Sequence, residues 1–222
     1  MDFEDEDYAY EDFDAEAWAR NRPTLTEDRS HPNHWRNRSA DLRASAGAIW
    51  YAMNNDKAVA DSLGYTYGFS MGVACRPVYH LTCGLALELI MKAVLVQRQT
   101  PIKQILTHHL VKLHGLLGLD QDEGRMKLLE FYQHALVWSG RYPVPTNAND
   151  DSLKQYYQLE NDVLTVSAPL SPGSILKVSR SSGATDWEPF CRLYDSYDAL
   201  FQHPYPGPSA PPPQAPPKID KL

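Results

Sequence analysis

The chain has 222 residues, of which 43% are hydrophobic and 11% aromatic, so it holds enough apolar material for a core and whole-chain disorder is excluded. Its net charge of −7 is concentrated, because residues 1–16 hold nine acidic residues and no basic one. Without those nine, 19 acidic side chains remain against 21 basic ones, a balance of about +2 that argues neither for nor against nucleic-acid binding.

Cysteine usage and the N-terminus predict a cytoplasmic protein. The three cysteines are widely spaced and form no CxxC motif, which argues against a disulfide framework or a zinc site and fits a reducing compartment. The N-terminus has neither the basic nor the apolar region of a signal peptide. The longest apolar stretch is interrupted by Glu88 and Lys92 and is predicted to be too short for a membrane span. We therefore expect no membrane association, no metal site and no cofactor.

Residues 1–38 are predicted to form a disordered arm. Repulsion among the acidic side chains of residues 1–16 should keep that stretch unfolded. Residues 21–38 are polar and basic, contain Pro23 and Pro32, and are typical of a linker. A solvated tail is the simpler interpretation of the acidic stretch. Alternatively, its interleaved aromatic residues dock on a basic groove of a protein partner or of this protein itself.

The spacing of apolar side chains predicts the first helices of the chain. They recur at helical intervals over residues 39–55. Residues 56–73, with glycines every four residues, fit either a loop or a helix with a face of small residues. Pro77 suits the first turn of a helix over residues 77–98. That helix is apolar around nearly its whole circumference and should therefore be buried on all sides.

Four further helices are predicted, over about residues 106–117, 120–138, 152–163 and 186–202. Capping-box spacings, Asp120 with Glu123 and Thr185 with Glu188, begin the second and the last of them. Between the last two helices the chain is rich in proline and glycine and is predicted to be irregular, with a short strand at residues 175–178.

The chain divides into an arm, one domain and a tail. Eight of the 17 prolines lie between Pro204 and Pro217, so residues 204–222 are predicted to be an extended, polyproline-like tail. The arm is residues 1–38, and residues 39–203 form one mostly helical domain.

Glu88 and Lys92 stand out because they interrupt the apolar helix. They are four residues apart with the acid first, so they lie on one face and can pair. Burial of either charge alone is costly, and each therefore needs a partner. A buried pair that fixes packing is the simpler interpretation. The alternative is a polar pocket at the centre of the domain.

His109 and Arg141 are the other candidate site residues. His109 begins a predicted helix that should pack near the Glu88 helix, whereas a capping or surface role is the simpler interpretation for the neighbouring histidines. Arg141 is held between a helix end and a proline, where it can pair with Glu88 or meet a phosphate. A structural ion pair is the simpler interpretation of this arginine.

The run LTCGLALELIMKAVL from Leu81, followed by His109-Leu110 and by Trp138 with Arg141-Tyr142-Pro143, resembles the HEPN (higher eukaryotes and prokaryotes nucleotide-binding) superfamily. It is similar to bacterial members in which an LExxxKAxL helix precedes an HxLxxL helix, and the resemblance covers about residues 40–145. It implies an all-α fold, a small antiparallel helical bundle that is often dimeric. It also implies RNA or a nucleotide as ligand. Many members are metal-independent ribonucleases of toxin–antitoxin or phage-defence systems, and others are non-catalytic.

The catalytic signature of that superfamily is absent from its expected place. Active members carry an arginine and a histidine, separated by four to six residues, near the start of a late helix. Only Arg29 and His34 have this spacing here, and they lie in the predicted linker. Arg76 and His80 are separated by three residues and lie on a different helix.

Two functions are therefore expected as alternatives. In the first, Glu88, His109 and Arg141 form a catalytic set from different helices, since acid–base cleavage of RNA needs a histidine beside the phosphate and a cation to stabilise it. In the second, the protein is a catalytically silent, dimeric interaction module that binds a protein partner through its acidic arm or a helical face. Convergence of the three residues on an open cleft favours the first, and their burial in the core favours the second.

Overall fold

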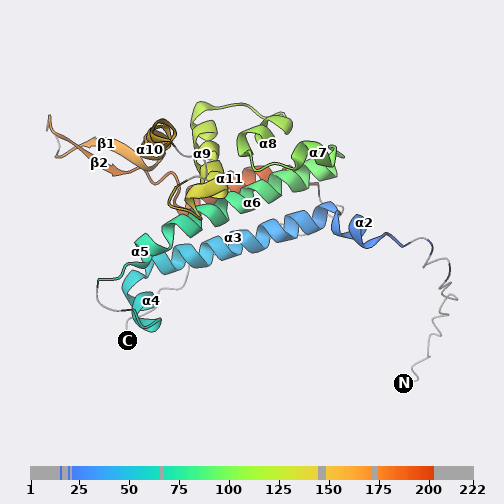
Figure 1. Cartoon of the computed structure of the whole chain (residues 1–222), viewed down its shortest axis with the longest axis horizontal. Helices are drawn as coiled ribbons and strands as arrows, with labels where there is room; N and C mark the ends of the chain where they lie inside the picture. Colours follow the sequence, from blue (N-terminus) through green and yellow to red (C-terminus); the bar gives the residue numbers. More distant parts are fainter. Residues whose placement is uncertain are drawn as a thin grey trace, which may run out of the picture.

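Helix α6 (Arg76–Gln97) runs through the centre of the molecule, as its apolar circumference predicts. The computed structural model describes residues 16, 20, 22–65, 68–144, 149–171 and 175–202. Figure 1 shows α3 (Pro32–Asn54) lying along α6. The two helices run antiparallel, because Ser39 near the start of α3 donates to Ala86 at the middle of α6, whereas the Trp50 ring near the end of α3 lies 5.3 Å from the Tyr79 ring near the start of α6. The expected all-α helical bundle is confirmed, with one small hairpin added.

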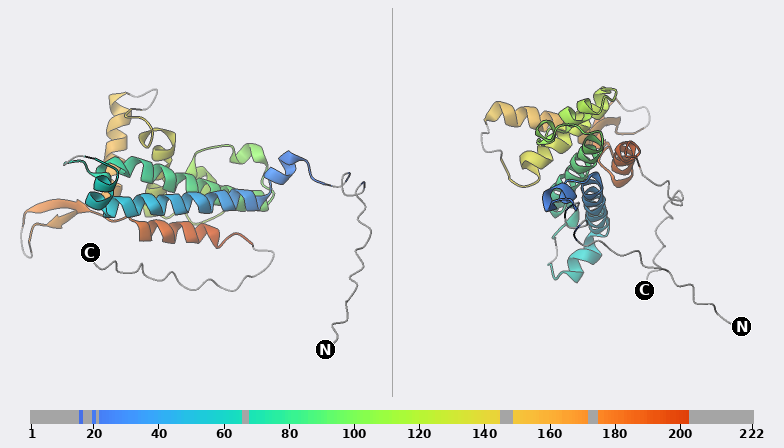
Figure 2. Two further views of the ribbon diagram at one scale, coloured as in Figure 1. Left: turned by 90° about the horizontal axis from the view of Figure 1, so that it is seen from below. Right: turned by 90° about the vertical axis from the view of Figure 1, so that its right-hand side faces the viewer.

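Helix α11 (Trp187–Asp198) packs against α6 beside α3 (Figure 2). Its start lies beside the start of α6, where the Tyr79 hydroxyl donates to the Thr185 carbonyl over 3.0 Å. Its end lies beside the start of α3, where the Arg36 guanidinium binds the Asp198 carboxylate through two contacts of 2.7 and 2.8 Å. Helix α11 therefore runs parallel to α6, and the ion pair joins the first and last long helices of the chain.

A third side of α6 is covered by α9 (Glu123–His134), which continues directly into the π-helical segment η1 (Ala135–Ser139). The backbones approach closely at Gly84. A Cβ atom at this position would lie 2.9 Å from both the Leu136 Cγ and the Tyr132 carbonyl oxygen. A glycine is therefore required here for the two helices to pack at this distance.

The other helices are short or peripheral: α2 (Leu25–Arg29), α4 (Asp56–Ser62), α5 (Met71–Ala74), α7 (Ile102–Ile105), α8 (Leu110–Leu116) and α10 (Asp150–Leu164). Strands β1 (Thr165–Pro169) and β2 (Lys177–Ser181) form an antiparallel hairpin with Thr165 opposite Ser181. Figure 1 shows this hairpin projecting from the bundle next to α10.

The predicted linker over residues 21–38 is wrong, because α3 begins at Pro32 and the domain therefore starts before residue 39. The proline that suggested a linker occupies the first turn of the helix, where a missing N–H costs nothing. His31 caps this turn by accepting a hydrogen bond from the Asn33 N–H. A capping box of Thr24 and Glu27 begins α2 just upstream.

Several predicted boundaries also shift. Both expected capping boxes are wrong, since the N-cap residues are Asp122 and Asp186. Residues 56–73 form α4 and α5, joined by a loop in which Gly64 and Gly68 have positive φ angles of 79° and 92°. The predicted strand at residues 175–178 lies at Lys177–Ser181, and its partner β1 was not expected.

The acidic residues 1–15 and the proline-rich residues 204–222, which the sequence predicts to be a disordered arm and an extended tail, lie outside the described residues. By length and composition alone, α6 is long enough to cross a membrane, so the prediction that it is too short was wrong. In its most apolar window 78% of the helix is buried within the protein, as is common for a core helix.

Candidate functional site

Glu88, the first predicted site residue, is buried and has its own partners. Its Oε1 lies 2.5 Å from the Lys92 Nζ, one turn along α6, and its Oε2 lies 2.9 Å from the His108 Nδ1. Glu88 and Lys92 are 3% and 5% exposed. The pair therefore satisfies itself within the core, and His108 rather than His109 is the histidine beside it.

His109 and Arg141 lie elsewhere on the surface. His109 is exposed, precedes α8 and lines an open groove between α8 and α9. Arg141 is exposed after η1, where its Nη2 donates to the Val137 carbonyl over 2.5 Å and its guanidinium lies 5.4 Å from the centre of the Tyr142 ring. Glu88 is buried in the core, His109 lines the groove between α8 and α9, and Arg141 lies after η1, so the structure does not bring the three together.

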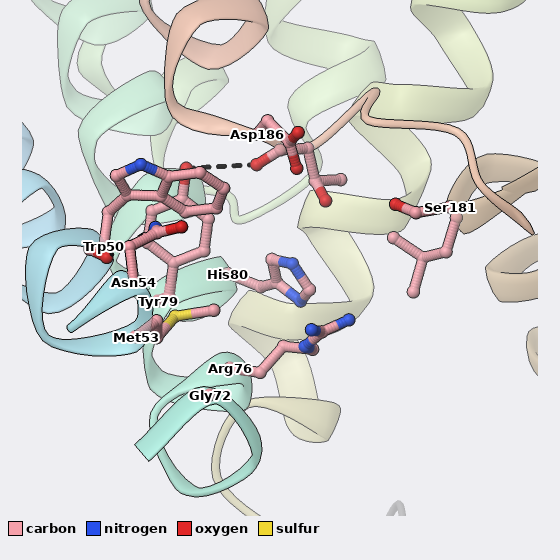
Figure 3. A pocket seen from close by; sticks show the side chains of 11 residues that line it. Trp50, Met53, Asn54, Gly72, Arg76, Tyr79, His80, Ser181 and Asp186 are labelled. Carbon is pink, nitrogen blue, oxygen red and sulfur yellow. Dashed lines mark hydrogen bonds between the residues drawn. The ribbon is translucent and has the colours of Figure 1, made fainter. Parts of the chain in front are cut away.

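A different pair on α6, Arg76 and His80, lines two neighbouring cavities. The first has a volume of about 130 Å³ and lies between α6, the end of α3, the second strand and the start of α11. Figure 3 shows the His80 ring and the Arg76 side chain extending from α6 into this space, with Asp186 and Ser181 across from them. Residues four apart lie on one helical face, which places the two side chains together.

His80 is buried without a hydrogen-bond partner among the described residues. It is 8% exposed, and neither ring nitrogen is hydrogen-bonded within the described part of the chain. Aromatic rings hold it in place: the Phe131 ring lies edge-on at 4.9 Å and the Tyr79 ring at 5.6 Å between centroids. Burial lowers the pKa of His80 to about 4, and the nearby charge of Arg76 contributes to this. The imidazole is therefore neutral at pH 7.

Arg76 supplies a positive charge that no carboxylate neutralises. Its guanidinium forms no ion pair or hydrogen bond with any residue that the structure describes. Across the cavity, Asp186 begins α11 as its N-cap residue, but its side chain makes no capping hydrogen bond. The Tyr79 hydroxyl fixes this corner through its bond to the Thr185 carbonyl, drawn in Figure 3.

The second cavity lies on the other side of the same pair and is larger, with a volume of about 480 Å³. Its walls come from α5, α6, η1 and α10, and the residues that line it beyond Arg76 and His80 are Val73, Pro77, Ala135, Ser139, Gly140, Tyr156 and Glu160. The π-helical segment forms one wall, and such segments occur often at functional sites because they displace side chains from regular helical positions.

Arg76 and His80 together can bind and act on an anion. A planar guanidinium with free donors suits phosphate or carboxylate oxygens. A neutral imidazole accepts a proton at one nitrogen and donates at the other, so it can serve as a general base. Among the described residues, no group of three or more histidine, cysteine, aspartate or glutamate side chains is placed to hold a metal ion.

Sequence reasoning considered this pair and set it aside because three residues, not four to six, separate Arg76 from His80. A signal was nevertheless present. Two polar side chains at a spacing of four stand at the beginning of the most apolar helix of the chain, as Glu88 and Lys92 do further along it. The sequence does not show that β2 and the start of α11 form a wall of this cavity. These segments lie more than 100 residues after Arg76 and His80 in the chain.

Comparison of the chain with models of known families, with curated proteins and with solved structures finds no match in any of the three.

Proposed function

We propose that the protein is a cytoplasmic, metal-independent ribonuclease of a toxin or phage-defence system, which binds an RNA phosphate between Arg76 and His80. The observation that supports the proposal is a buried histidine beside an arginine, neither of which has a hydrogen-bond partner or counter-ion among the described residues. In the same part of the chain, the sealed polar atoms without a hydrogen-bond partner are the Tyr132 hydroxyl and the Gln133 side-chain carbonyl oxygen, whereas the His80 ring lines both cavities, where a ligand can reach it. A histidine with a strongly shifted pKa that lines a cavity beside a charged group is a candidate for a functional site. The resemblance to HEPN proteins identifies RNA or a nucleotide as the class of ligand.

The chemistry needs one base and one cation. Neutral His80 takes the proton from a ribose 2′-hydroxyl, whose oxygen attacks the neighbouring phosphorus. As the new 2′-O–P bond forms, the P–O5′ bond breaks, and His80 returns the proton to the departing 5′ oxygen. The products are a 2′,3′-cyclic phosphate and a free 5′-hydroxyl. Arg76 binds the phosphate oxygens, where negative charge increases in the transition state.

Cleavage of a labelled single-stranded RNA in the presence of EDTA tests this function. We expect His80→Gln to lower the rate by roughly 100- to 10,000-fold, which is the usual contribution of a general base. His109→Gln is the matched control, because His109 is exposed in a separate groove and should leave the rate unchanged. Far-ultraviolet circular dichroism verifies that each variant is folded. Equal cleavage by the wild type and His80→Gln contradicts the assignment.

A second candidate function is supported by the exposed hairpin. Strands β1 and β2 project from the bundle, and large apolar side chains on and beside them face solvent, most of all Ile175, which is 95% exposed. A two-stranded sheet with unpaired edges is of marginal stability alone and offers its edges for pairing. We propose that two copies pair through this hairpin, which would give the dimer that the alternative expects, on a surface other than the acidic arm or the helical face named there.

The molar mass in solution tests the hairpin proposal. Light scattering should give a dimer for the wild type and a monomer for the double variant Ile175→Ser, Leu176→Ser. The exposed change Leu25→Ser, on α2 at the opposite end of the bundle from the hairpin (Figure 1), is the control and should remain dimeric. A monomeric wild type at micromolar concentration, or a double variant that is still a dimer, contradicts this role of the hairpin.

A further inference from the structure

The larger cavity beside Arg76 and His80 has the volume of a small-molecule binding site. Its volume of about 480 Å³ lies within the range of small-molecule sites, whereas the 130 Å³ cavity is smaller than that range. Both cavities reach the same two side chains. A ligand that binds them with its phosphate therefore has room for one further group, and that room lies on the side of α10.

The wall on the side of α10 carries a half-buried carboxylate. Glu160 lines the cavity and has no cationic partner among the described residues. Burial raises its pKa, while a hydrogen bond with the Tyr156 hydroxyl opposes the rise. Burying a carboxylate without a cation is costly unless a ligand supplies donors. The opposite walls, from Val73, Pro77 and Ala135, are apolar.

An ionised carboxylate accepts hydrogen bonds and donates none. Among the four RNA bases, only guanine presents two adjacent N–H donors, N1–H and N2–H, on its Watson–Crick edge. Adenine and cytosine present one donor beside an acceptor, and uracil presents one donor between two acceptors. Proteins read unstacked RNA bases on this edge while their faces contact flat or apolar side chains.

We propose that the cavity between α6, η1 and α10 is a base-binding site in which Glu160 selects guanine. The phosphate next to that guanine lies against Arg76 and His80, so this inference rests on the proposed phosphate site. The same chemistry recognises a guanosine residue within RNA and a free guanosine monophosphate. The proposal thus adds a substrate class and a specificity-determining residue to the site.

Binding of the four nucleoside monophosphates, measured by isothermal titration calorimetry, tests the guanine site without any need for cleavage. The wild type should bind guanosine monophosphate roughly 5- to 150-fold more tightly than the adenosine analogue, the range expected for a bidentate contact to a base. Glu160→Gln replaces one acceptor by a donor of the same size and should abolish the preference. Glu130→Gln, a change in the separate groove of His109, is the matched control and should retain it.

Mapping of cleavage sites on RNA separates the two sources of guanine. If the wild type cuts beside guanosine but mononucleotides show no preference, the site reads guanine in the polymer. A preference in both assays indicates that the free nucleotide suffices. Equal affinity for all four nucleotides together with unselective cleavage, or a guanine preference that survives in Glu160→Gln, overturns the proposal. Cleavage that depends on His80 but ignores the base contradicts only this inference and leaves the proposed ribonuclease function standing.

Discussion

The two halves of α6 differ in whether their polar side chains have polar partners. In the second half Lys92 binds Glu88 at 2.5 Å, and His108 completes the coordination of the carboxylate at 2.9 Å. In the first half Arg76 and His80 have the same spacing of four residues, yet neither has a polar partner among the described residues. One helix thus carries a buried pair whose charges are matched, and an exposed arginine beside a buried histidine, both of which line cavities.

The difference separates architecture from function. A buried pair that neutralises itself needs no ligand, and its removal should affect folding alone. A histidine and an arginine that line a cavity and have no polar partner among the described residues are available to a ligand, so their removal should affect binding more than folding. Substitutions at Glu88 and Lys92 should therefore change mainly the stability, and substitutions at Arg76 and His80 mainly the activity.

The largest expected effect on stability is that of Lys92→Met. The substitution leaves the Glu88 carboxylate buried with only the exposed His108 beside it, and loss of one partner of a buried pair typically costs about 3–5 kcal/mol. Urea unfolding at pH 7 measures the free energy. The double variant Glu88→Leu, Lys92→Met removes both charges and should recover most of the loss. A Lys92→Met protein as stable as the wild type would show that the pair is not structural.

The next effect in size is a pH dependence of stability that originates at His80. The unfolded chain protonates this side chain below its ordinary pKa of 6.5, whereas the folded protein does so only near pH 4. Protons therefore bind the unfolded state preferentially, and stability falls as the pH falls from 7 to 5. For His80 the loss is about 2 kcal/mol over this interval.

The variant His80→Gln isolates this contribution. Other histidines with lowered pKa values, His114 and His134, are retained in the variant. The difference in pH dependence between the wild type and the variant therefore belongs to His80 alone. Urea unfolding of the wild type and of His80→Gln, each at pH 7 and at pH 5, gives the four free energies of unfolding that the comparison needs. Identical pH dependence of the two proteins would mean that His80 is not held neutral in the folded state.

A smaller effect is expected from His108→Ala. The His108 side chain is 67% exposed, so its contact with Glu88 is screened by water, and exposed pairs contribute about 0.5 kcal/mol. Unfolding free energies of His108→Ala in the wild type and in the Glu88→Leu, Lys92→Met background measure the coupling. A loss as large as that of Lys92→Met would make the histidine, rather than the lysine, the main partner of the carboxylate.

Much of the fold could be predicted because it depends on local patterns. The apolar circumference of α6 and the proline in its first turn are visible in the residues themselves, and its buried Glu88 and Lys92 pair follows from their spacing. The start of α3 was missed because Pro32 fits a linker and a helix N-terminus equally well. The hairpin was missed because cross-strand pairing, such as Thr165 with Ser181, is not written in either strand alone.

The candidate site was predicted less well than the fold, for a physical reason. Glu88, His109 and Arg141 were grouped on the assumption that polar residues on neighbouring helices converge. Instead Glu88 pairs with Lys92 on its own helix, His109 lines a separate groove, and Arg141 binds a carbonyl of its own segment. The cavity around His80 depends instead on contacts between segments far apart in the chain, and the start of α11 reaches it through the bond between Tyr79 and Thr185.

The smallest effect on stability, and the sharpest test of the comparison, is that of Arg76→Gln. Because Arg76 is exposed and has no counter-ion in the described part of the chain, its loss should change the free energy of unfolding by less than about 0.5 kcal/mol. RNA affinity should fall roughly 10- to 100-fold, since a charge-assisted contact to phosphate is lost. The charge of Arg76 also contributes to the low pKa of His80, so its removal should shift the acidic limb of the cleavage rate to higher pH. Arg192→Gln, which removes a surface arginine paired with Glu188 on α11, should change none of these quantities. If Arg76→Gln loses stability but keeps its RNA affinity, Arg76 has a structural role, as Glu88 and Lys92 do, and α6 carries no anion-binding site.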